Sequence, residues 1–195
     1  GITIRLGYAD FSVYHDKEND FYTTKEKSIK SNKEAKFLRK ISLVDAPGHE
    51  SLMATMLSGA AIVDGALLLV AANEKCPQPQ TKEHLMALQI SGIKNVIVVQ
   101  NKVDLVSHEE AVKNHKQIKD FLAGTDYKDA PIIPMSARAN VNVDVLLKQI
   151  QESIPTPKQD AKKDPIMLVA RSFDINKPGI KPAKLVGGVL GGTVK

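Results

Sequence analysis

Short uninterrupted runs of apolar residues alternate along the chain with stretches in which apolar residues recur at helical spacing. The runs lie within Gly65 to Asn73, within Asn95 to Asp104, where the apolar residues lead into a polar loop, and within Ala130 to Ala137. A short apolar run bounded by polar residues is typical of a strand that is buried on both faces of a sheet. Amphipathic helices are expected from Glu50 onward, from Glu83 to Ile90, from Glu109 to Leu122 and from Asn142 to Ile154. Strands that alternate with helices predict a parallel α/β sheet with right-handed crossovers.

The N-terminal part of the chain is predicted to be extended and to carry an insertion. Residues Ile2 to Tyr14 alternate loosely between apolar and polar types, and Phe37 to Val44 form a further apolar strand that ends at a Pro-Gly turn. Between them, residues 15–36 are charged and polar, with few apolar side chains from Asp16 to Lys36. This composition predicts an exposed loop or a disordered insertion.

The composition changes again after Ile154. Residues 155–165 are polar and contain proline, which is typical of a linker between domains. Two further strands are predicted within residues 166–175 and 187–195, with glycines at bends or bulges. We therefore expect an α/β domain over residues 1–154, a linker over residues 155–165 and the start of an all-β unit over residues 166–195.

Composition narrows the class of protein. The chain has 195 residues, of which 43% are hydrophobic, and its one cysteine, Cys76, excludes an internal disulfide framework. No apolar run reaches the roughly 18 residues of a membrane span, and no signal-peptide pattern is present, so a cytoplasmic protein is expected. The formal net charge of +5 is compatible with a nucleic-acid partner, although a lysine-coated soluble surface explains it without one.

Polar residues gather directly after three of the predicted strands. The clusters are Asp45 to His49, Asn101 to Asp104 and Ser136 to Arg138. In open α/β sheets, ligands bind beyond the carboxyl ends of the strands. We expect the topology to bring all three clusters to the same edge of the sheet.

Two of these clusters have the chemistry to bind a guanine base. The Asp104 carboxylate can accept hydrogen bonds from guanine N1–H and N2–H, a donor pair that adenine lacks. The aliphatic stem of Lys102 can lie across the base, and the Asn101 amide can connect neighbouring loops. Ser136 and Ala137 can present backbone N–H groups to guanine O6. Taken alone, the segment from Asn101 to Asp104 is equally an ordinary polar turn, and the segment from Ser136 to Arg138 is better explained as an ordinary helix entry.

The third cluster, Asp45-Ala46-Pro47-Gly48-His49, suggests a site for phosphate and magnesium. Asp45 can hold a Mg²⁺-bound water, because Mg²⁺ keeps several waters and takes few protein carboxylates. Gly48 allows its N–H to approach a terminal phosphate, and His49 would orient an attacking water. The hydroxyl of Thr3 is a further candidate Mg²⁺ ligand. The alternative is that Asp45 caps the next helix, His49 is a surface residue and Thr3 is an ordinary strand residue.

Together, the segments GITI, DAPGH, NKVD and SAR resemble the switch I, switch II and guanine-recognition motifs of the translational GTPases, in order and in rough spacing. The stretch from Phe37 to Leu85 narrows the resemblance to the gamma subunits of the archaeal and eukaryotic translation initiation factor two, and the archaeal form is the closer fit. The resemblance covers nearly the whole chain apart from Asp16 to Lys36.

The resemblance implies a P-loop GTPase-type G domain that binds GTP or GDP with Mg²⁺ and hydrolyses GTP. It also implies a heterotrimer with alpha and beta subunits that carries methionylated initiator tRNA to the small ribosomal subunit. No membrane is expected among its partners. Residues 166–195 would be the first strands of a β-barrel. The implied GTP-binding residues are Asp45, Gly48, Asn101, Lys102, Val103, Asp104, Ser136, Ala137 and Arg138. The implied magnesium ligands are Gly1, Thr3 and, through water, Asp45, and the implied catalytic residue is His49.

The sequence departs from the family pattern in two places. No Gly-x-x-x-x-Gly-Lys-Ser/Thr phosphate loop occurs in it, and in the family this loop precedes the GITI segment, so we expect negligible GTP affinity for these 195 residues alone. Between Tyr14 and Phe37 the family usually carries paired Cys-x-x-Cys motifs that bind zinc, whereas Cys76 is the only cysteine here. We therefore expect no zinc. The insertion at residues 15–36 would take the place of the zinc knuckle, as a solvated loop or as a contact for RNA or a partner.

Two other functions fit the same residues. One is an elongation-factor-like carrier of another aminoacyl-tRNA, such as a selenocysteine-specific factor. Ala46, where elongation factors usually have threonine, and the Leu-Gly-Tyr-Ala segment favour the initiation subunit instead. The other is a scaffold that keeps the GTPase fold without hydrolysis, and only the absent phosphate loop supports it.

Overall fold

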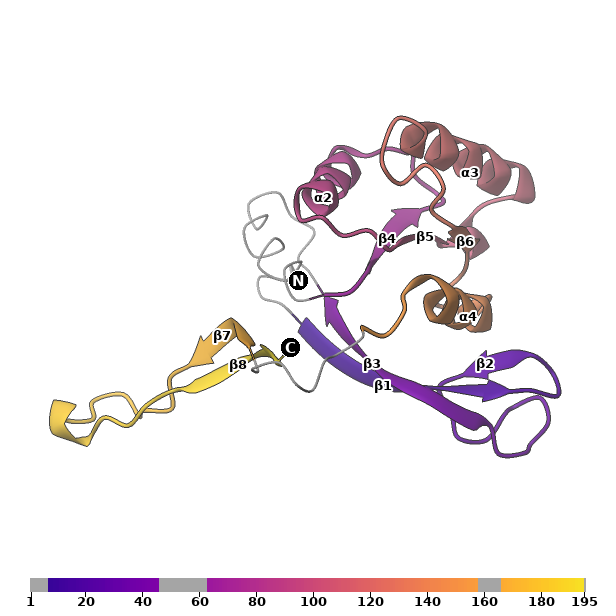
Figure 1. The fold of residues 1–195 in the computed structure, drawn as a ribbon. Coiled ribbons are helices and arrows are strands. Elements are labelled where there is room, and N and C mark those ends of the chain that lie inside the picture. Colours follow the sequence, from indigo (N-terminus) through magenta and orange to yellow (C-terminus); the bar gives the residue numbers. More distant parts are fainter. Residues whose placement is uncertain (1–6, 46–62, 158–165, 195) are drawn as a thin grey trace.

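The computed structural model describes residues 7–45, 63–157 and 166–194. Within these ranges it contains two three-stranded sheets, one two-stranded hairpin and three α-helices (Figure 1). The fold class predicted from the sequence is confirmed in the part that carries the alternating strands and helices. None of the helices in these ranges is long and apolar enough to cross a membrane.

The first sheet is antiparallel and has the strand order β2-β1-β3. β1 (Gly7–Asp16) pairs along its length with β3 (Lys36–Asp45), and β2 (Phe21–Thr23) pairs with the end of β1. The two extended segments predicted on either side of the insertion are thus confirmed. They form an antiparallel hairpin because the insertion returns the chain directly alongside itself.

The second sheet is parallel and has the order β4-β5-β6. Its strands are β4 (Ala66–Ala71), β5 (Val96–Asn101) and β6 (Ile132–Pro134). The helices are α2 (Pro79–Ile90) after β4, the short η2 (Val103–Leu105) and α3 (His108–Leu122) after β5, and α4 (Val143–Ser153) after β6. The predicted strands and the last three predicted helices are therefore confirmed. The helix expected from Glu50 onward lies outside the described residues.

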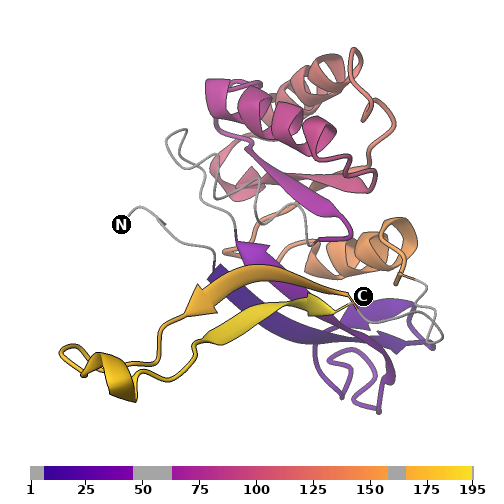
Figure 2. The same cartoon turned by 60° about the vertical axis from the view of Figure 1, so that its left-hand side comes forward.

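Two apolar clusters hold this domain together. On one face of the parallel sheet, β4 and β5 pack against α2 and α3, as Figure 2 shows. This cluster includes Leu68, Val70, Val96, Val98, Leu85, Leu88, Ile118 and Leu122. On the other face, Ile97 and Ile133 pack against Ile150 of α4, and Ile41 of β3 and Leu67 of β4 border the same cluster. Helix α4 thus contributes to a core that both sheets share.

The central strands differ in how completely they are covered. β5 is buried from Val96 to Gln100, as its apolar run predicts. The prediction that β4 is buried on both faces is wrong at Leu69, whose side chain is 61% exposed. Among the described residues, β3 pairs only with β1 and β4 pairs only with β5. Each of these two strands therefore keeps one unpaired edge in the described part of the chain.

The prediction for the segment from Asp16 to Lys36 is only partly right. Many of its side chains are exposed, but the segment is folded: it contains β2, a β-bridge between Lys27 and Glu34, and buried Ser28. The Asp16 carboxylate, itself buried, accepts hydrogen bonds from Glu18 N–H at 3.1 Å, from the Asn19 amide at 3.0 Å and from the Ser31 hydroxyl at 2.7 Å. Polar side chains that bond to one another here replace the apolar contacts that a composition analysis looks for.

This polar cluster, Asp16, Asn19, Ser28 and Ser31, is built from two pairs of residues that are each three positions apart. Ser28 Oγ accepts bonds from the backbone N–H groups of Lys30 and Ser31 at 3.2 and 3.4 Å. Each pair therefore forms a tight turn, and the two turns meet at the Asp16 carboxylate. Hydrogen bonds among polar side chains therefore hold the two turns of the insertion together, and no cysteine takes part.

The insertion is also attached to the parallel domain through α4. Asp20 accepts a hydrogen bond from Lys148 of α4 at 2.6 Å, and His15 Nε2 lies 3.0 Å from the other oxygen of the same carboxylate. The ring of His15 stacks on Tyr22 with centroids 4.4 Å apart. The folded insertion thus contacts the helix that follows β6.

We predict that acid opens the insertion through Asp16. Hydrogen bonds from Ser28, Ser31 and Asn19 hold the pKa of the Asp16 carboxyl well below its ordinary value. A lowered native pKa contributes stability above the unfolded-state value of about 4, and this contribution is lost as the pH falls through the native pKa. Protection factors for amide hydrogen exchange in residues 18–33 should therefore begin to fall below about pH 4.

An Asp16→Asn variant, which cannot take up a proton, should lack this acid response. The matched control is Asp10→Asn in β1, where the carboxylate is exposed, bonds Ser42 and pairs with Lys40. The control should leave the response of the insertion unchanged. An Asp16→Asn variant whose insertion responds to acid like the unmodified chain would contradict the prediction.

The C-terminal residues form a separate antiparallel hairpin of β7 (Met167–Phe173) and β8 (Val189–Val194), with the short helix η3 (Pro182–Lys184) in the connection. The two strands predicted here are confirmed. Val169, Val189 and Leu190 are each more than half exposed. In Figure 1 the hairpin points away from α2 and α3.

Candidate functional site

The first part of the site is the segment that follows β5. Asn101 ends the strand, Lys102 has a left-handed backbone with φ of 64°, and η2 begins at Val103. For a residue with a side chain this conformation costs about 1–2 kcal/mol, and such residues gather at functional sites. The Val103 N–H donates to the Met135 carbonyl oxygen at 3.3 Å, which holds the segment against the residues after β6. The Lys102 and Asp104 side chains are exposed.

The second part is the loop that follows β6. Ser136 and Val141 exchange two backbone hydrogen bonds of 3.3 and 3.0 Å, so the loop is closed at its base. The buried Ser136 hydroxyl accepts a bond from Ala139 N–H at 3.1 Å, while Ala137 and Arg138 are exposed at the tip. The Ser136 N–H, one of the two proposed donors to guanine, is therefore engaged within the loop.

The two parts meet. The Ala137 N–H donates to Asn101 Oδ1 at 3.1 Å, across 36 positions of sequence. The parallel pairing of β5 with β6 places both segments at the carboxyl edge of the sheet, as predicted. The Asn101 amide thus connects neighbouring loops in the way its position suggested.

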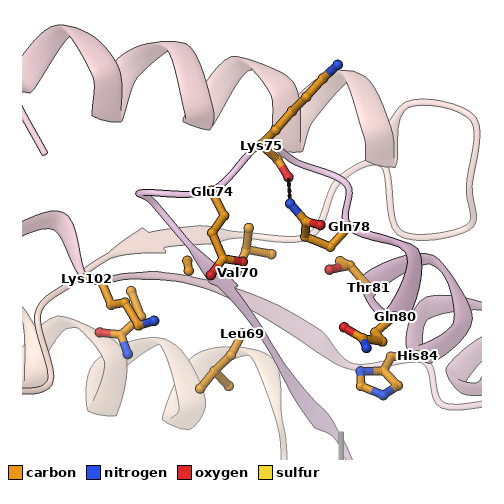
Figure 3. Close-up of a pocket in the computed structure, with 11 residues that line it drawn as sticks. Leu69, Val70, Glu74, Lys75, Gln78, Gln80, Thr81, His84 and Lys102 are labelled. Atoms are coloured by element: carbon orange, nitrogen blue, oxygen red, sulfur yellow. Dashed lines mark hydrogen bonds between the residues drawn. The ribbon is translucent and has the colours of Figure 1, made fainter. Parts of the chain in front are cut away.

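A cavity of about 310 Å³ lies beside this junction, at the carboxyl ends of β4 and β5 (Figure 3). Its lining comes from β4, the loop after it, α2 and the end of β5: Leu69, Val70, Ala71, Glu74, Lys75, Gln78, Gln80, Thr81, His84, Asn101 and Lys102. Burial lowers the pKa of His84, so its ring is neutral at neutral pH. Figure 3 shows the Lys75 ammonium directed away from the other labelled side chains. Lys102 lines the cavity and also belongs to the segment after β5, so it connects the two.

Of the third cluster, only Asp45 lies among the described residues, so the prediction that all three clusters share one edge is tested for the first two alone. Asp45 is the last residue of β3 in the antiparallel sheet, where it is exposed and pairs with Gly7. A Cβ at Gly7 would come within 3.3 Å of the Asp45 Cβ, so glycine leaves room for this carboxylate. Gly1, Thr3, Gly48 and His49 lie outside the described residues, and their roles stay predictions. In the described ranges no group of three or more His, Cys, Asp or Glu side chains is arranged to hold a metal ion.

The sequence analysis missed three residues that shape the site. Gln100 and Asn114 are 1% and 4% exposed and hydrogen-bond to each other at 2.9 Å behind the Asn101 segment. Asn142, with φ of 59°, donates from its side chain to the Pro134 carbonyl oxygen at 2.7 Å and so ties β6 to the start of α4. A glutamine directly after the apolar residues Val96 to Val99, within the predicted buried strand, was the available signal for the first of these.

Comparison with known proteins defines the class of this fold and site. The family model described as the elongation factor Tu GTP binding domain matches residues 1–156. The chain therefore belongs to the family of translational GTPases that carry this domain. Its fold, a parallel sheet with helices on both faces and polar loops at the carboxyl ends of β5 and β6, agrees with that membership.

Within this family the chain is similar to one kind of protein in particular. It is 59% identical over 194 residues to the translation initiation factor 2 subunit gamma of Methanocaldococcus jannaschii, and 55% identical over 194 residues to that of Pyrococcus furiosus. Each match covers the whole of this chain and 47% of the relative. The chain thus spans about half the length of the curated relatives it matches.

Among solved structures, the chain is similar to the translation elongation factor SelB from Methanococcus maripaludis in complex with the GTP analogue GppNHp. The TM-score is 0.72 at 28% identity, and the match covers 98% of this chain and 36% of the other. This relative is named as an elongation factor. The structural likeness therefore supports the GTPase fold, while the sequence identity is higher to the initiation subunits.

Proposed function

We propose that the chain is part of the GTP-binding, GTP-hydrolysing subunit of a translation initiation factor that delivers methionylated initiator tRNA to the small ribosomal subunit. The observation that carries the proposal is the contact between Asn101 and Ala137 at adjacent strand ends, in a domain of the translational GTPase family. The names of the relatives support the initiation factor over other members. Alpha and beta subunits of the same factor are the proposed partners, and the cytoplasm is the proposed location.

In this proposal the guanine base lies across the junction of the two loops. Asp104 accepts hydrogen bonds from N1–H and N2–H, the Lys102 stem covers one face of the ring, and the exposed loop tip at Ala137 and Arg138 lies beside O6. Ser136 supports the loop from beneath. Asn101 joins the loops, and Val103 and Arg138 complete the two segments.

The phosphates and Mg²⁺ are proposed to lie toward β3. Asp45 would hold a Mg²⁺-bound water, Gly1 and Thr3 would be ligands of the ion, and Gly48 would meet the terminal phosphate. His49 is the residue proposed to position the attacking water. The unpaired edges of β3 and β4, which border a common core, leave room for a further strand that would bring a phosphate loop to this side.

The proposed domain division follows the sequence analysis. Residues 1–154 would form the G domain and residues 155–165 a linker, with residues 15–36 standing where relatives of the family bind zinc. The β7–β8 hairpin would begin a β-barrel, because its exposed apolar side chains need further strands to cover them. No zinc is proposed for the insertion.

In a protein that joins these residues to a phosphate loop, a Lys102→Gly variant should separate stability from nucleotide binding. Glycine adopts the left-handed conformation at no steric cost, so the variant is expected to be as stable as the unmodified protein or more stable. The loss of the Lys102 stem should nevertheless weaken GDP binding, by roughly the 1 kcal/mol that burial of one or two methylene groups contributes. Thermal melting and calorimetry would check the two effects. A variant that loses stability and keeps GDP affinity would contradict the proposed role of Lys102.

The experiment that tests the proposed function is filter binding of tRNA to a protein in which these residues are joined to a Gly-Lys-Ser/Thr phosphate loop. With GTP, such a protein should retain initiator methionyl-tRNA and release elongator methionyl-tRNA, and GDP should weaken retention. Equal retention of both tRNAs would favour the elongation-type carrier. Absence of any GTP effect would favour the scaffold and overturn the proposal.

A further inference from the structure

A buried glutamine lies directly behind the loops of the proposed guanine site. Gln100 is the residue before Asn101 in β5, and its side chain is 1% exposed. Its Nε2 group donates to the Ala111 carbonyl oxygen at 2.8 Å and to Asn114 Oδ1 at 2.9 Å, both on α3. A buried amide is costly unless its hydrogen bonds are made, so this side chain is held in one orientation.

The second amide extends the connection to another loop. Asn114 Nδ2 donates to the Glu74 carbonyl oxygen at 2.8 Å. Glu74 belongs to the segment from Ala72 to Gln78, which we call the β4–α2 loop and which contributes to the cavity. The loop also begins beside the site, because the Ala72 N–H donates to the Asn101 carbonyl oxygen at 2.8 Å.

The backbone of Gln100 completes the arrangement. Its carbonyl oxygen accepts a bond from the Met135 N–H at 2.8 Å, one residue before the loop that carries Ala137. The side chain of Gln100 thus faces α3, where Asn114 continues the connection to the β4–α2 loop, while its backbone faces the loop after β6. Any shift of this residue would move both base-binding segments relative to the cavity.

We propose that Gln100 and Asn114 are positioning residues that hold the base-binding loops in register and couple them to the β4–α2 loop. This inference rests on the proposed function. An apolar side chain of similar size at position 100 would fill the same space without needing partners. The polar pair instead allows only one arrangement in which each bond is made, and that requirement specifies the positions of three loops at once.

The first test measures base selectivity. A protein that joins these residues to a phosphate loop is compared with its Gln100→Met variant for binding of GDP and inosine diphosphate, which lacks the N2 amino group. Met keeps the volume of Gln but cannot donate to Asn114. The preference for GDP over inosine diphosphate should fall several-fold, up to about tenfold, because the loss of one buried hydrogen bond changes an equilibrium constant by about that much. A merely structural role would lower the melting temperature and leave this ratio unchanged.

The second test uses Asn114→Asp, which is close in shape. The carboxylate still accepts from Gln100, but it places an oxygen against the Glu74 carbonyl in place of the N–H donor. In the unmodified protein, GDP should slow amide hydrogen exchange in residues 72–78. In the variant this protection of the β4–α2 loop should be lost, while the selectivity for GDP over inosine diphosphate persists. This arm remains decisive if the Gln100→Met variant does not fold.

Gln117→Met is the matched control. Gln117 Oε1 accepts a bond from the Cys76 N–H at 3.1 Å, so it tethers the same loop to α3 without contacting Gln100. The control should change neither the base selectivity nor the protection that GDP confers on residues 72–74.

The outcomes separate the inference from the proposed function. An unmodified protein that does not prefer GDP to ADP would overturn the proposed function itself. A protein that prefers GDP, and whose folded Gln100→Met variant keeps the full preference over inosine diphosphate, would overturn the assignment of Gln100. GDP-dependent protection of residues 72–78 that survives in Asn114→Asp would overturn the coupling.

Discussion

An Asp104→Asn variant is expected to prefer xanthine nucleotides to guanine nucleotides. Xanthine has a carbonyl oxygen where guanine has the N2 amino group. Asparagine can donate from its amide nitrogen to that oxygen and accept from N1–H, whereas it opposes the guanine amino group with a second donor. One bidentate pair is worth about 1–3 kcal/mol of discrimination, so each preference should change by roughly 5- to 150-fold.

The measurement is competition of GDP and xanthosine diphosphate for a protein that carries both these residues and a phosphate loop. Asp129→Asn is the matched control, since Asp129 is an exposed carboxylate between α3 and β6 that the proposed site does not use. It should leave both affinities unchanged. If Asp104→Asn weakened the binding of both nucleotides equally, Asp104 would not be the residue that hydrogen-bonds to the edge of the base.

The second large effect concerns the phosphates. The 195 residues alone should bind GTP negligibly, and joining them to a Gly-x-x-x-x-Gly-Lys-Ser/Thr loop should raise the affinity by roughly a thousandfold or more. Hydrogen bonds to charged groups contribute about 1.5–3 kcal/mol each, and such a loop offers several backbone N–H groups and a lysine to the phosphates. The base site by itself offers one carboxylate and the stem of one lysine, which is too little to retain a nucleotide.

Titration calorimetry of the two proteins would measure this difference. The control is the joined protein with the lysine of the added loop replaced by alanine, which should lose most of the gain. Tight binding of GTP by the 195 residues alone would mean that residues within the chain hold the phosphates. The proposed division of the site between base loops and a separate phosphate loop would then be wrong.

The fold was predictable from the sequence where the order of apolar and polar residues within a short segment indicates which side chains are buried. β5 and β6 follow from their apolar runs, and α3 follows from the periodicity of its apolar residues. Leu69 was not predictable in this way. Its exposure depends on which segments cover β4. The apolar run from Gly65 to Asn73 indicates that burial of the strand is favourable, but it does not show which segment would bury it.

The insertion shows a different limit. Its composition predicts no stable core, yet Asp16 is bonded to Ser31, 15 positions away, and Asp20 is bonded to Lys148, 128 positions away. Composition counts polar residues without reporting which of them become partners. A cluster closed by hydrogen bonds therefore looks like a disordered segment until the partners are placed in space.

The candidate site was predictable in part for a topological reason. Parallel strands place their carboxyl ends at one edge, so the contact of Asn101 with Ala137 follows from the order of strands and helices. The bond from Asn114 to the Glu74 carbonyl does not follow from topology. It depends on which face of α3 is turned toward the sheet and how far that helix lies along it.

The junction of Asn101, Asp104 and Ala137 is proposed to bind guanine in preference to other bases. Displacement of a fluorescent GDP analogue by GDP or by ADP, from a protein that joins these residues to a phosphate loop, tests this claim most directly. GDP should displace the analogue at a concentration roughly a hundredfold lower than ADP does, because adenine lacks the N1–H and N2–H donors and the O6 acceptor. Displacement by GDP and ADP at the same concentration would contradict it.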